Sequence, residues 1–191
     1  MPGSVEYDPW VMACIILVLA WTIGDVCTDM KTAEYIVDLT SGFLTPVLLP
    51  AVTFITAAII SFSTGSSWAT MSILVPVTVP MSIQLMGGDG NQVVQDPIFL
   101  STFASVLSGS VFGDHCSPIS DTTVLSSTAS GSDHIDHVRT QLPYAIVCGV
   151  VALLAGYIFT GLGLSLIVSL SVGLVLVIGV LKIFGKPILN E

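Results

Sequence analysis

The segment 113–123, GDHCSPISDTT, holds the densest group of polar and ionisable side chains in the sequence. Its two carboxylates, Asp114 and Asp121, stand seven residues apart. Pro118 lies between them and cannot continue a helix, so backbone carbonyl oxygens are left free near it. Hydroxyl groups surround both carboxylates, at Ser117, Ser120, Thr122 and Thr123. Carboxylate, carbonyl and hydroxyl oxygens are hard ligands, and the pattern therefore predicts a Na⁺ site.

The same carboxylates could also carry protons, because a carboxylate that is removed from water holds its proton more tightly. A group that binds either Na⁺ or H⁺ couples the two ions by competition. We place Na⁺ at Asp121 and its neighbouring hydroxyls, and we expect Asp121 and Asp114 to bind Na⁺ or H⁺ in turn. Two plainer interpretations stay open: Asp121 as a helix cap alone, and Asp114 as a partner of His115 or of a neighbouring helix.

A second polar interruption, STGSS at 63–67, lies between two apolar arms. Gly65 gives the chain a place to break its helix. The hydroxyl oxygens of this segment can help to bind a cation or a carboxylate but cannot carry a proton: Ser63, Thr64, Ser66 and Ser67. The alternative is a solvated loop between two membrane spans.

The sequence does not indicate a zinc or enzyme site. His115 and Cys116 follow Asp114 directly, and adjacent residues rarely converge on one tetrahedral Zn²⁺. A pattern such as H-E-x-x-H is also missing. His134 and His137 fall in a stretch that we interpret as a cytoplasmic loop, where a pH-sensing role is conceivable. Since there is no nucleophile–base motif, we expect no enzyme and no cofactor.

The overall composition decides which kind of protein holds these segments. Of 191 residues, 53% are hydrophobic and only 9% are charged, whereas soluble domains are typically about 25% charged. Four Lys and Arg against thirteen Asp and Glu give a net charge of −9, which argues against binding nucleic acid. The apolar runs are long enough to cross about 30 Å of hydrocarbon as helices. We therefore predict an all-α polytopic membrane protein in a lipid bilayer.

We predict about 5–7 transmembrane or re-entrant helices in a single membrane domain over 1–191. An apolar helix at 10–23 leads into an interfacial segment at 25–40. A hairpin unit follows at 45–87 and would be about 63 Å long as one continuous helix. It must therefore fold back, either as two spans or as a re-entrant hairpin with the STGSS segment at its tip.

Two further units complete the predicted domain. A broken-helix unit at 97–130 interrupts an apolar helix at Gly113 and resumes it near Asp121. A terminal helix pair at 143–184 reverses at a short Gly-Leu-Gly turn, which makes its helices antiparallel. By the positive-inside rule, we expect both ends of this pair, and the C-terminus, in the cytoplasm because basic residues flank them: Arg139, Lys182 and Lys186.

Three segments resemble the NhaC-type Na⁺/H⁺ antiporters of the ion transporter superfamily: AWTIGDVCTDMKTAEYIV, STGSSWATMSILVPVTVPM and GDHCSPISDTTVLSSTASGSDHIDHVRTQLPYA. The resemblance covers about residues 20–145. It implies exchange of Na⁺ for H⁺, with some members exchanging malate and H⁺ for lactate and Na⁺. It also implies inverted repeats, re-entrant hairpins and a transport domain that moves over a fixed scaffold. The segments 63–67 and 113–123 are then expected to face each other at one site.

Members of that family are more than twice as long as this chain and have a second half of inverted topology. We therefore expect a C-terminal portion of a transporter, as a fragment, a truncated gene product or a half that pairs with a missing N-terminal half, a second chain or a homodimer partner. We predict a Na⁺/H⁺ antiporter in the plasma membrane of a prokaryote. Two alternatives stay open: a Na⁺- or H⁺-coupled carrier of organic or amino acids, and a non-transporting fragment.

Overall fold

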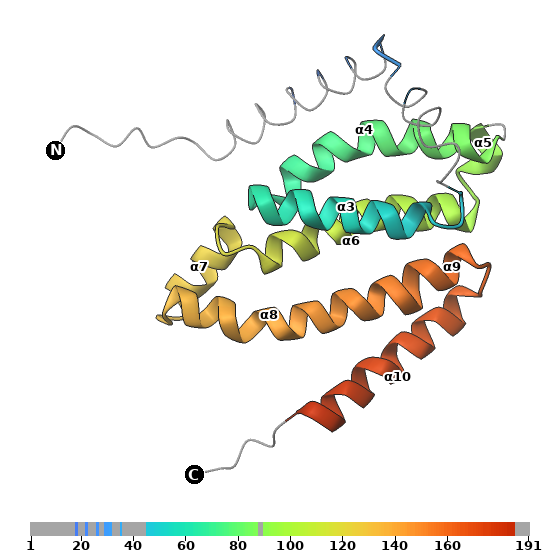
Figure 1. Cartoon of the computed structure of the whole chain (residues 1–191). Coiled ribbons are helices and arrows are strands. Elements are labelled where there is room, and N and C mark those ends of the chain that lie inside the picture. The colour runs from blue at the N-terminus through green and yellow to red at the C-terminus, as the bar shows by residue number, and fades with distance from the viewer. Residues whose placement is uncertain are drawn as a thin grey trace, which may run out of the picture.

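The computed structural model describes residues 45–87 and 90–185, together with a few single positions between 18 and 35 (Figure 1). Within these residues the regular structure is helical throughout and contains no strand. Three helical stretches are long and apolar enough to cross a membrane: Ser67–Met86, His134–Gly161 and Leu166–Ile183. The all-α membrane fold predicted from the sequence is confirmed. The apolar run at 10–23 and the interfacial segment at 25–40 fall almost entirely outside the described residues.

A helical hairpin forms the first described unit. Helix α3 runs over Leu49–Thr64 and helix α4 over Ser67–Met86. Between them Gly65 adopts a left-handed backbone conformation, with φ of 66°, which favours glycine because a Cβ atom is disfavoured there. Ser66 caps α4, because its Oγ accepts a hydrogen bond from the Ala69 N–H at 3.3 Å. The STGSS segment thus forms the tip of this hairpin.

A broken helix follows a four-residue helix, α5 (Gly90–Val93). Helix α6 extends over Pro97–Cys116 and helix α7 over Asp121–Ala129, and residues 117–120 form the break between them. The sequence interpretation that α6 ends at Gly113 is wrong, because the helix continues for almost another turn. The break begins instead at Ser117, immediately before Pro118, which is disfavoured in a helix interior.

A long helical segment then returns along α6. It comprises α8 (His134–Val151), a π-helical stretch η1 (Ala152–Ile158) and α9 (Phe159–Gly161). The predicted loop before Pro143 is therefore wrong from His134 onward. Asp133 starts the helix early, because its carboxylate accepts hydrogen bonds from two backbone N–H groups of the first turn, at 2.9 and 3.1 Å.

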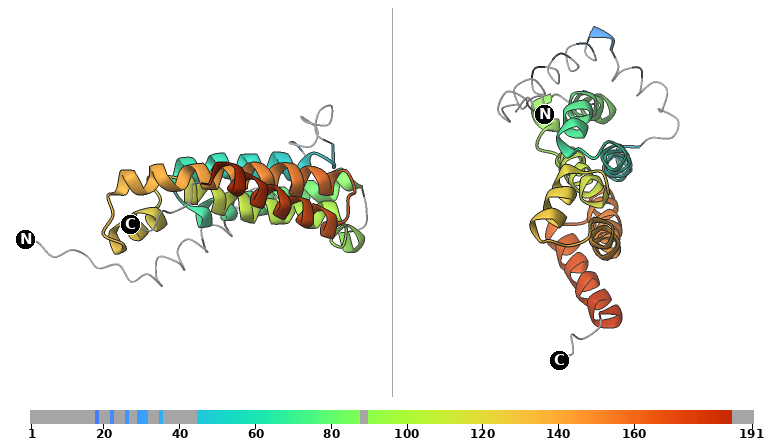
Figure 2. Two further views of the ribbon diagram at one scale, coloured as in Figure 1. Left: turned by 90° about the horizontal axis from the view of Figure 1, so that it is seen from below. Right: turned by 90° about the vertical axis from the view of Figure 1, so that its left-hand side faces the viewer.

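Helix α10 (Leu166–Phe184) is the last described element and follows the turn after α9. It diverges from α8, as two directions of view show (Figures 1 and 2). The hairpin, α6, α8 and α10 lie side by side in that order (Figure 2). The hairpin tip, the break, the start of α8 and the end of α10 share one end of this row, and the α9–α10 turn lies at the other (Figure 1).

Helices α3 and α6 run parallel and pack with almost no space between their backbones. A Cβ atom at Gly109 would overlap the backbone of Phe54, and one at Gly113 would overlap the carbonyl oxygen of Ala58. Ser61 of α3 strengthens this contact, since its hydroxyl donates to the Ser110 carbonyl oxygen at 2.5 Å. Small residues therefore hold the hairpin against the helix that leads into the break, as is common in membrane proteins.

Candidate functional site

Asp114 lies in the last turn of α6 and is buried, with 6% of its surface exposed. Each of its carboxylate oxygens accepts a hydrogen bond from a hydroxyl group beyond the break. Ser120 Oγ donates to Asp114 Oδ1 at 2.8 Å, and Thr122 Oγ1 donates to Oδ2 at 3.1 Å. The two hydroxyl oxygens are themselves 2.7 Å apart. These three side chains form what we call the Asp114 cluster.

The break brings these groups together because only residues 117–120 separate the last turn of α6 from the first turn of α7. Ser120 occupies the position that caps α7, yet its hydroxyl bonds Asp114 and makes no cap hydrogen bond. Ser117 and Ser120 are fully buried. The Ser117 N–H donates to the Asp114 carbonyl oxygen at 3.0 Å, and Ser117 Oγ accepts weakly from the Ile119 N–H at 3.4 Å. The break is therefore folded around the carboxylate.

The structure separates the two carboxylates predicted for the site. Asp121 lies in the first turn of α7 and is exposed, whereas Asp114 is buried. A negative charge near a helix N-terminus is stabilised by the helix dipole, which gives Asp121 a structural role there. Thr123, two residues further on, is buried at 3% exposure. Asp114 is thus the carboxylate that the chain has removed from water.

The hydroxyls of the hairpin tip serve their own helices in this conformation. Ser63 and Thr64 are exposed and donate to carbonyl oxygens one turn back in α3, at 2.8 and 2.9 Å. Ser66 caps α4, and Ser67 is half-buried at the start of that helix. The structure therefore does not bring these four hydroxyls into hydrogen bonds with Asp114.

The two interruptions nevertheless meet. A Cβ atom at Gly65 would lie 3.0 Å from the Ile119 carbonyl oxygen. The backbone of the hairpin tip thus packs directly on the backbone of the break, next to Ser120. The expectation that the segments 63–67 and 113–123 face each other agrees with this contact.

Two residues of α8 anchor the break from the other side, and the sequence analysis did not assign them this position. His134 Nε2 lies 2.7 Å from the Pro118 carbonyl oxygen, and its Nδ1 lies 3.0 Å from Ser127 Oγ of α7. Gln141 Nε2 donates to the His115 carbonyl oxygen at 2.8 Å. The only sequence signal for these contacts was the polar side chains in the first turns of α8, which follow the break.

The chemistry of the Asp114 cluster follows from its composition. It offers one carboxylate and neutral hydroxyl oxygens, beside the C-terminal end of α6, where helix carbonyls carry partial negative charge. Such a set suits a monovalent cation or a proton. Among residues 45–87 and 90–185, no three His, Cys, Asp or Glu side chains gather as a transition-metal site would require.

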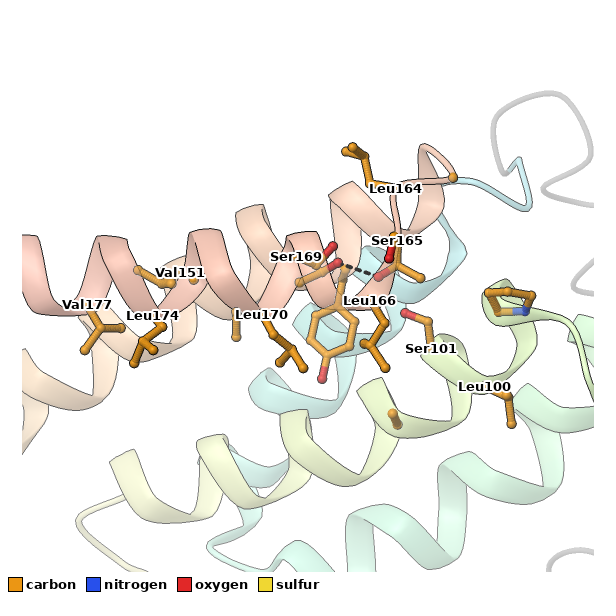
Figure 3. A pocket seen from close by; sticks show the side chains of 18 of the residues that line it. Leu100, Ser101, Val151, Leu164, Ser165, Leu166, Ser169, Leu170, Leu174 and Val177 are labelled. Atoms are coloured by element: carbon orange, nitrogen blue, oxygen red, sulfur yellow. Dashed lines mark hydrogen bonds between the residues drawn. The ribbon is translucent and has the colours of Figure 1, made fainter.

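A separate cavity of about 1000 Å³ lies between α6, the α8–η1 segment and α10. Its walls are mainly aliphatic, with Leu100, Leu166 and Leu170 among them (Figure 3). Ser101 and Ser169 also line it (Figure 3). Leu100 and Ser101 belong to the first turns of α6, so the cavity lies at the opposite end of that helix from Asp114. It does not contribute to the carboxylate site.

The profile described as "Na⁺/H⁺ antiporter family" matches residues 10–162. An uncharacterized protein of Haemophilus influenzae is 39% identical over 89% of this chain and 31% of its own length. An arginine/ornithine antiporter of Halobacterium salinarum is 33% identical over 74% of this chain and 27% of its own length.

A further relative is the malate-2H⁺/Na⁺-lactate antiporter of Bacillus subtilis, which is 31% identical over 65% of this chain and 25% of its own length. The chain thus spans less than a third of the length of each of these relatives. No solved structure matches the chain. The family match covers both the hairpin and the broken helix that carries Asp114.

Proposed function

Because the chain belongs to the Na⁺/H⁺ antiporter family, we propose that it forms part of a secondary transporter that exchanges Na⁺ for H⁺ at Asp114. The observation that carries this proposal is the burial of one carboxylate at a helix break, with both oxygens hydrogen-bonded to hydroxyls. A buried ionisable group in a membrane protein is costly and is retained where it has a function. Broken helices are where transporters bind their ions.

Exchange follows if Asp114 holds one ion at a time. A hydroxyl can donate and accept hydrogen bonds. Ser120 and Thr122 can therefore donate to the carboxylate when it is free, and can turn their oxygen lone pairs toward a Na⁺ when it is occupied. A protonated Asp114 has no charge to offer a cation. Na⁺ and H⁺ then compete for one group, and a proton gradient drives Na⁺ the other way.

The contact between Gly65 and Ile119 supports a further step in this proposal. We propose that the chain is the C-terminal portion of an NhaC-type transporter in a plasma membrane, with its C-terminus in the cytoplasm. The hairpin and the broken helix would move together as the transport domain. The missing inverted half, or a second chain, would supply the scaffold. Movement of this domain against the scaffold would open Asp114 to either side of the membrane.

A carrier of organic or amino acids is the second candidate. The named relatives that exchange arginine for ornithine, or malate and protons for lactate and Na⁺, favour it. A carboxylate substrate would need a buried base or a helix N-terminus. Three basic residues fall among the described positions, and all are exposed: Lys31, Arg139 and Lys182. The remaining part of a longer transporter would have to supply that base.

The decisive experiment uses everted membrane vesicles from cells that express the chain from its own locus, together with the DNA upstream of it. A preformed proton gradient is established, and its collapse on addition of Na⁺ is recorded with a pH-sensitive dye. We expect Asp114→Asn to abolish the Na⁺ response, because the amide can neither bind a proton nor offer a negative charge. Asp121→Asn is the matched control, since Asp121 is exposed and should leave the response largely intact.

Membrane levels of each variant are measured in parallel by immunoblot. A Na⁺ response that survives Asp114→Asn would refute the assignment of the exchanged ion to Asp114. A response that appears only when malate, lactate or arginine is added with Na⁺ would replace the cation antiporter with the organic-solute carrier. A wild-type chain that responds to none of these would contradict transport itself.

A further inference from the structure

Ser110 of α6 carries a hydroxyl that is fully buried and has no hydrogen-bond partner among the described residues. Other hydroxyls of the same helix donate to a carbonyl oxygen one turn back. Thr102 donates to Ile98 at 2.7 Å, and Ser108 donates to Ala104 at 2.9 Å. A buried polar group without a partner is destabilising. Ser110 therefore has an oxygen that the described part of the chain does not use.

The position of Ser110 relates it to Asp114. The two residues are four apart on α6, so their side chains lie on the same face of the helix, about 6 Å apart along its axis. Ser61 of α3 fixes this turn from the neighbouring face, because it donates to the Ser110 carbonyl oxygen. The unpartnered hydroxyl thus belongs to the turn of α6 next to Asp114, on the side away from the break.

We propose that Ser110 Oγ is a further oxygen ligand for the exchanged cation, next to Asp114 on the side of the helix interior. This inference rests on the proposed exchange of Na⁺ at Asp114. A cation that leaves water must replace its shell of water oxygens with protein oxygens. The Asp114 cluster supplies the carboxylate and two hydroxyls from one side, and Ser110 supplies a neutral oxygen from the other. Ser110 Oγ would gain its partner only when the cation is bound, which would explain why this hydroxyl is unpaired when no cation is bound.

The test compares Ser110→Ala with wild type in everted vesicles in which Na⁺ or Li⁺ dissipates the proton gradient. We expect the half-saturating Na⁺ concentration to rise by about tenfold, the value for loss of one moderately strong interaction, with little change in the maximal rate. Li⁺ is smaller and needs fewer oxygen ligands. Its half-saturating concentration should therefore rise less, so that the variant shifts its preference toward Li⁺.

Ser169→Ala is the matched control. Ser169 carries another buried hydroxyl without a partner among the described residues, but it lies on α10 at the apolar cavity. It should leave both half-saturating concentrations unchanged. Ser110→Cys conserves side-chain size while replacing the oxygen with sulfur, a poor ligand for a hard cation. It should weaken Na⁺ as Ser110→Ala does, and it carries the test if the alanine variant fails to accumulate in membranes.

The outcomes separate this inference from the proposed function. If Ser110→Ala and Ser110→Cys both keep wild-type half-saturating Na⁺ while Asp114→Asn abolishes the response, Ser110 is not a ligand and the role of Asp114 stands. If the half-saturating concentrations of Na⁺ and Li⁺ rise equally in both variants, the effect comes from a general distortion of the helix, and Ser110 is not a ligand. If wild type shows no cation response, the proposed function itself fails.

Discussion

Ser120 and Thr122 are not equivalent hydrogen-bond donors in the Asp114 cluster. Each hydroxyl has one proton to donate. Ser120 Oγ is 2.8 Å from Asp114 Oδ1, and Thr122 Oγ1 can give its proton either to Asp114 Oδ2 at 3.1 Å or to Ser120 Oγ at 2.7 Å. Ser120 is buried and Thr122 is exposed. Ser120 is therefore the principal donor to the carboxylate, and Thr122 is the adjustable one.

Ser120→Ala should show what this donor contributes. The substitution leaves a buried carboxylate oxygen without its shorter hydrogen bond, which should cost about 1–3 kcal/mol. We expect a lower thermal midpoint of the detergent-solubilised protein and weaker Na⁺-dependent protection against unfolding. Both are measured by a thermal shift assay that does not use a thiol-reactive dye. Ser126→Ala removes an exposed hydroxyl of the same helix. Equal thermal midpoints for the two variants would contradict the role given to Ser120.

The sequence located the segment 113–123 but could not tell which of its two carboxylates is buried. The density of polar groups in 113–123 was enough to identify the segment. Which carboxylate is buried depends on where α6 ends. A helix that ends at Gly113 would leave Asp114 in a loop, whereas the helix that continues to Cys116 holds it in a packed final turn. That difference depends on the packing of α6 against α3, which the polar pattern of 113–123 alone does not record.

At the scale of elements, the contact between α3 and α6 positions the break. Gly109 and Gly113 form a G-x-x-x-G pair on an apolar helix, a pattern typical of close helix packing in membranes. Interpreting Gly113 as a helix breaker overlooked this spacing. The glycine has an ordinary helical conformation, and it is required because the α3 backbone occupies the space of a side chain.

Gly113→Ala should therefore separate α3 from α6. The added methyl group meets backbone atoms of Ala58 and Phe62, which cannot turn away as a flexible side chain could. Overpacking of this kind typically costs about 1–3 kcal/mol, and more where backbone must move. We expect less monodisperse protein in size-exclusion chromatography and a lower thermal midpoint.

Gly179→Ala is the control for this prediction. Gly179 lies on α10, and a Cβ atom there would meet nothing within 4 Å. Alanine also has a higher helix propensity than glycine, so Gly179→Ala should be neutral or slightly stabilising. Wild-type behaviour of Gly113→Ala in both assays would show that the two helices are less tightly packed than the structure has them.

The start of α8 shows another limit of the sequence. Polar composition and Pro143 favoured a loop up to that proline, but α8 begins nine residues earlier, at His134, because Asp133 caps it with hydrogen bonds to the first turn. The extension has a consequence for the site. It brings His134 to the Pro118 carbonyl oxygen and Gln141 to the His115 carbonyl oxygen, so that α8 holds both sides of the break.

At the scale of the whole molecule, both interruptions lie at one end of the row of helices (Figure 1). The apolar lengths and the short Gly-Leu-Gly turn were enough to predict a helical membrane protein with an antiparallel pair at its C-terminal end. The order of the helices in the row was not predictable, because it depends on which faces pack. The divergence of α10, which opens the apolar cavity, is a further result of that packing (Figures 1 and 3).

This arrangement makes a prediction about sidedness. The turn before α8, which contains Ser132, and the turn after α9, which contains Leu162, lie at opposite ends of the long helical segment His134–Gly161. That segment has 28 residues and is long enough to cross a bilayer. Arg139 and Lys182 lie near the first of these ends, so the positive-inside rule assigns that end to the cytoplasm.

Single cysteines at the two turns test this assignment. With the native cysteines replaced by serine, Ser132→Cys and Leu162→Cys are exposed to a membrane-impermeant maleimide in intact cells and in everted vesicles. We expect Leu162→Cys to react only in cells and Ser132→Cys only in vesicles. The reverse pattern would invert the orientation while preserving the span. Reaction of both from one side would mean that the α8–α9 segment does not cross the membrane, and the span and its orientation would both be wrong.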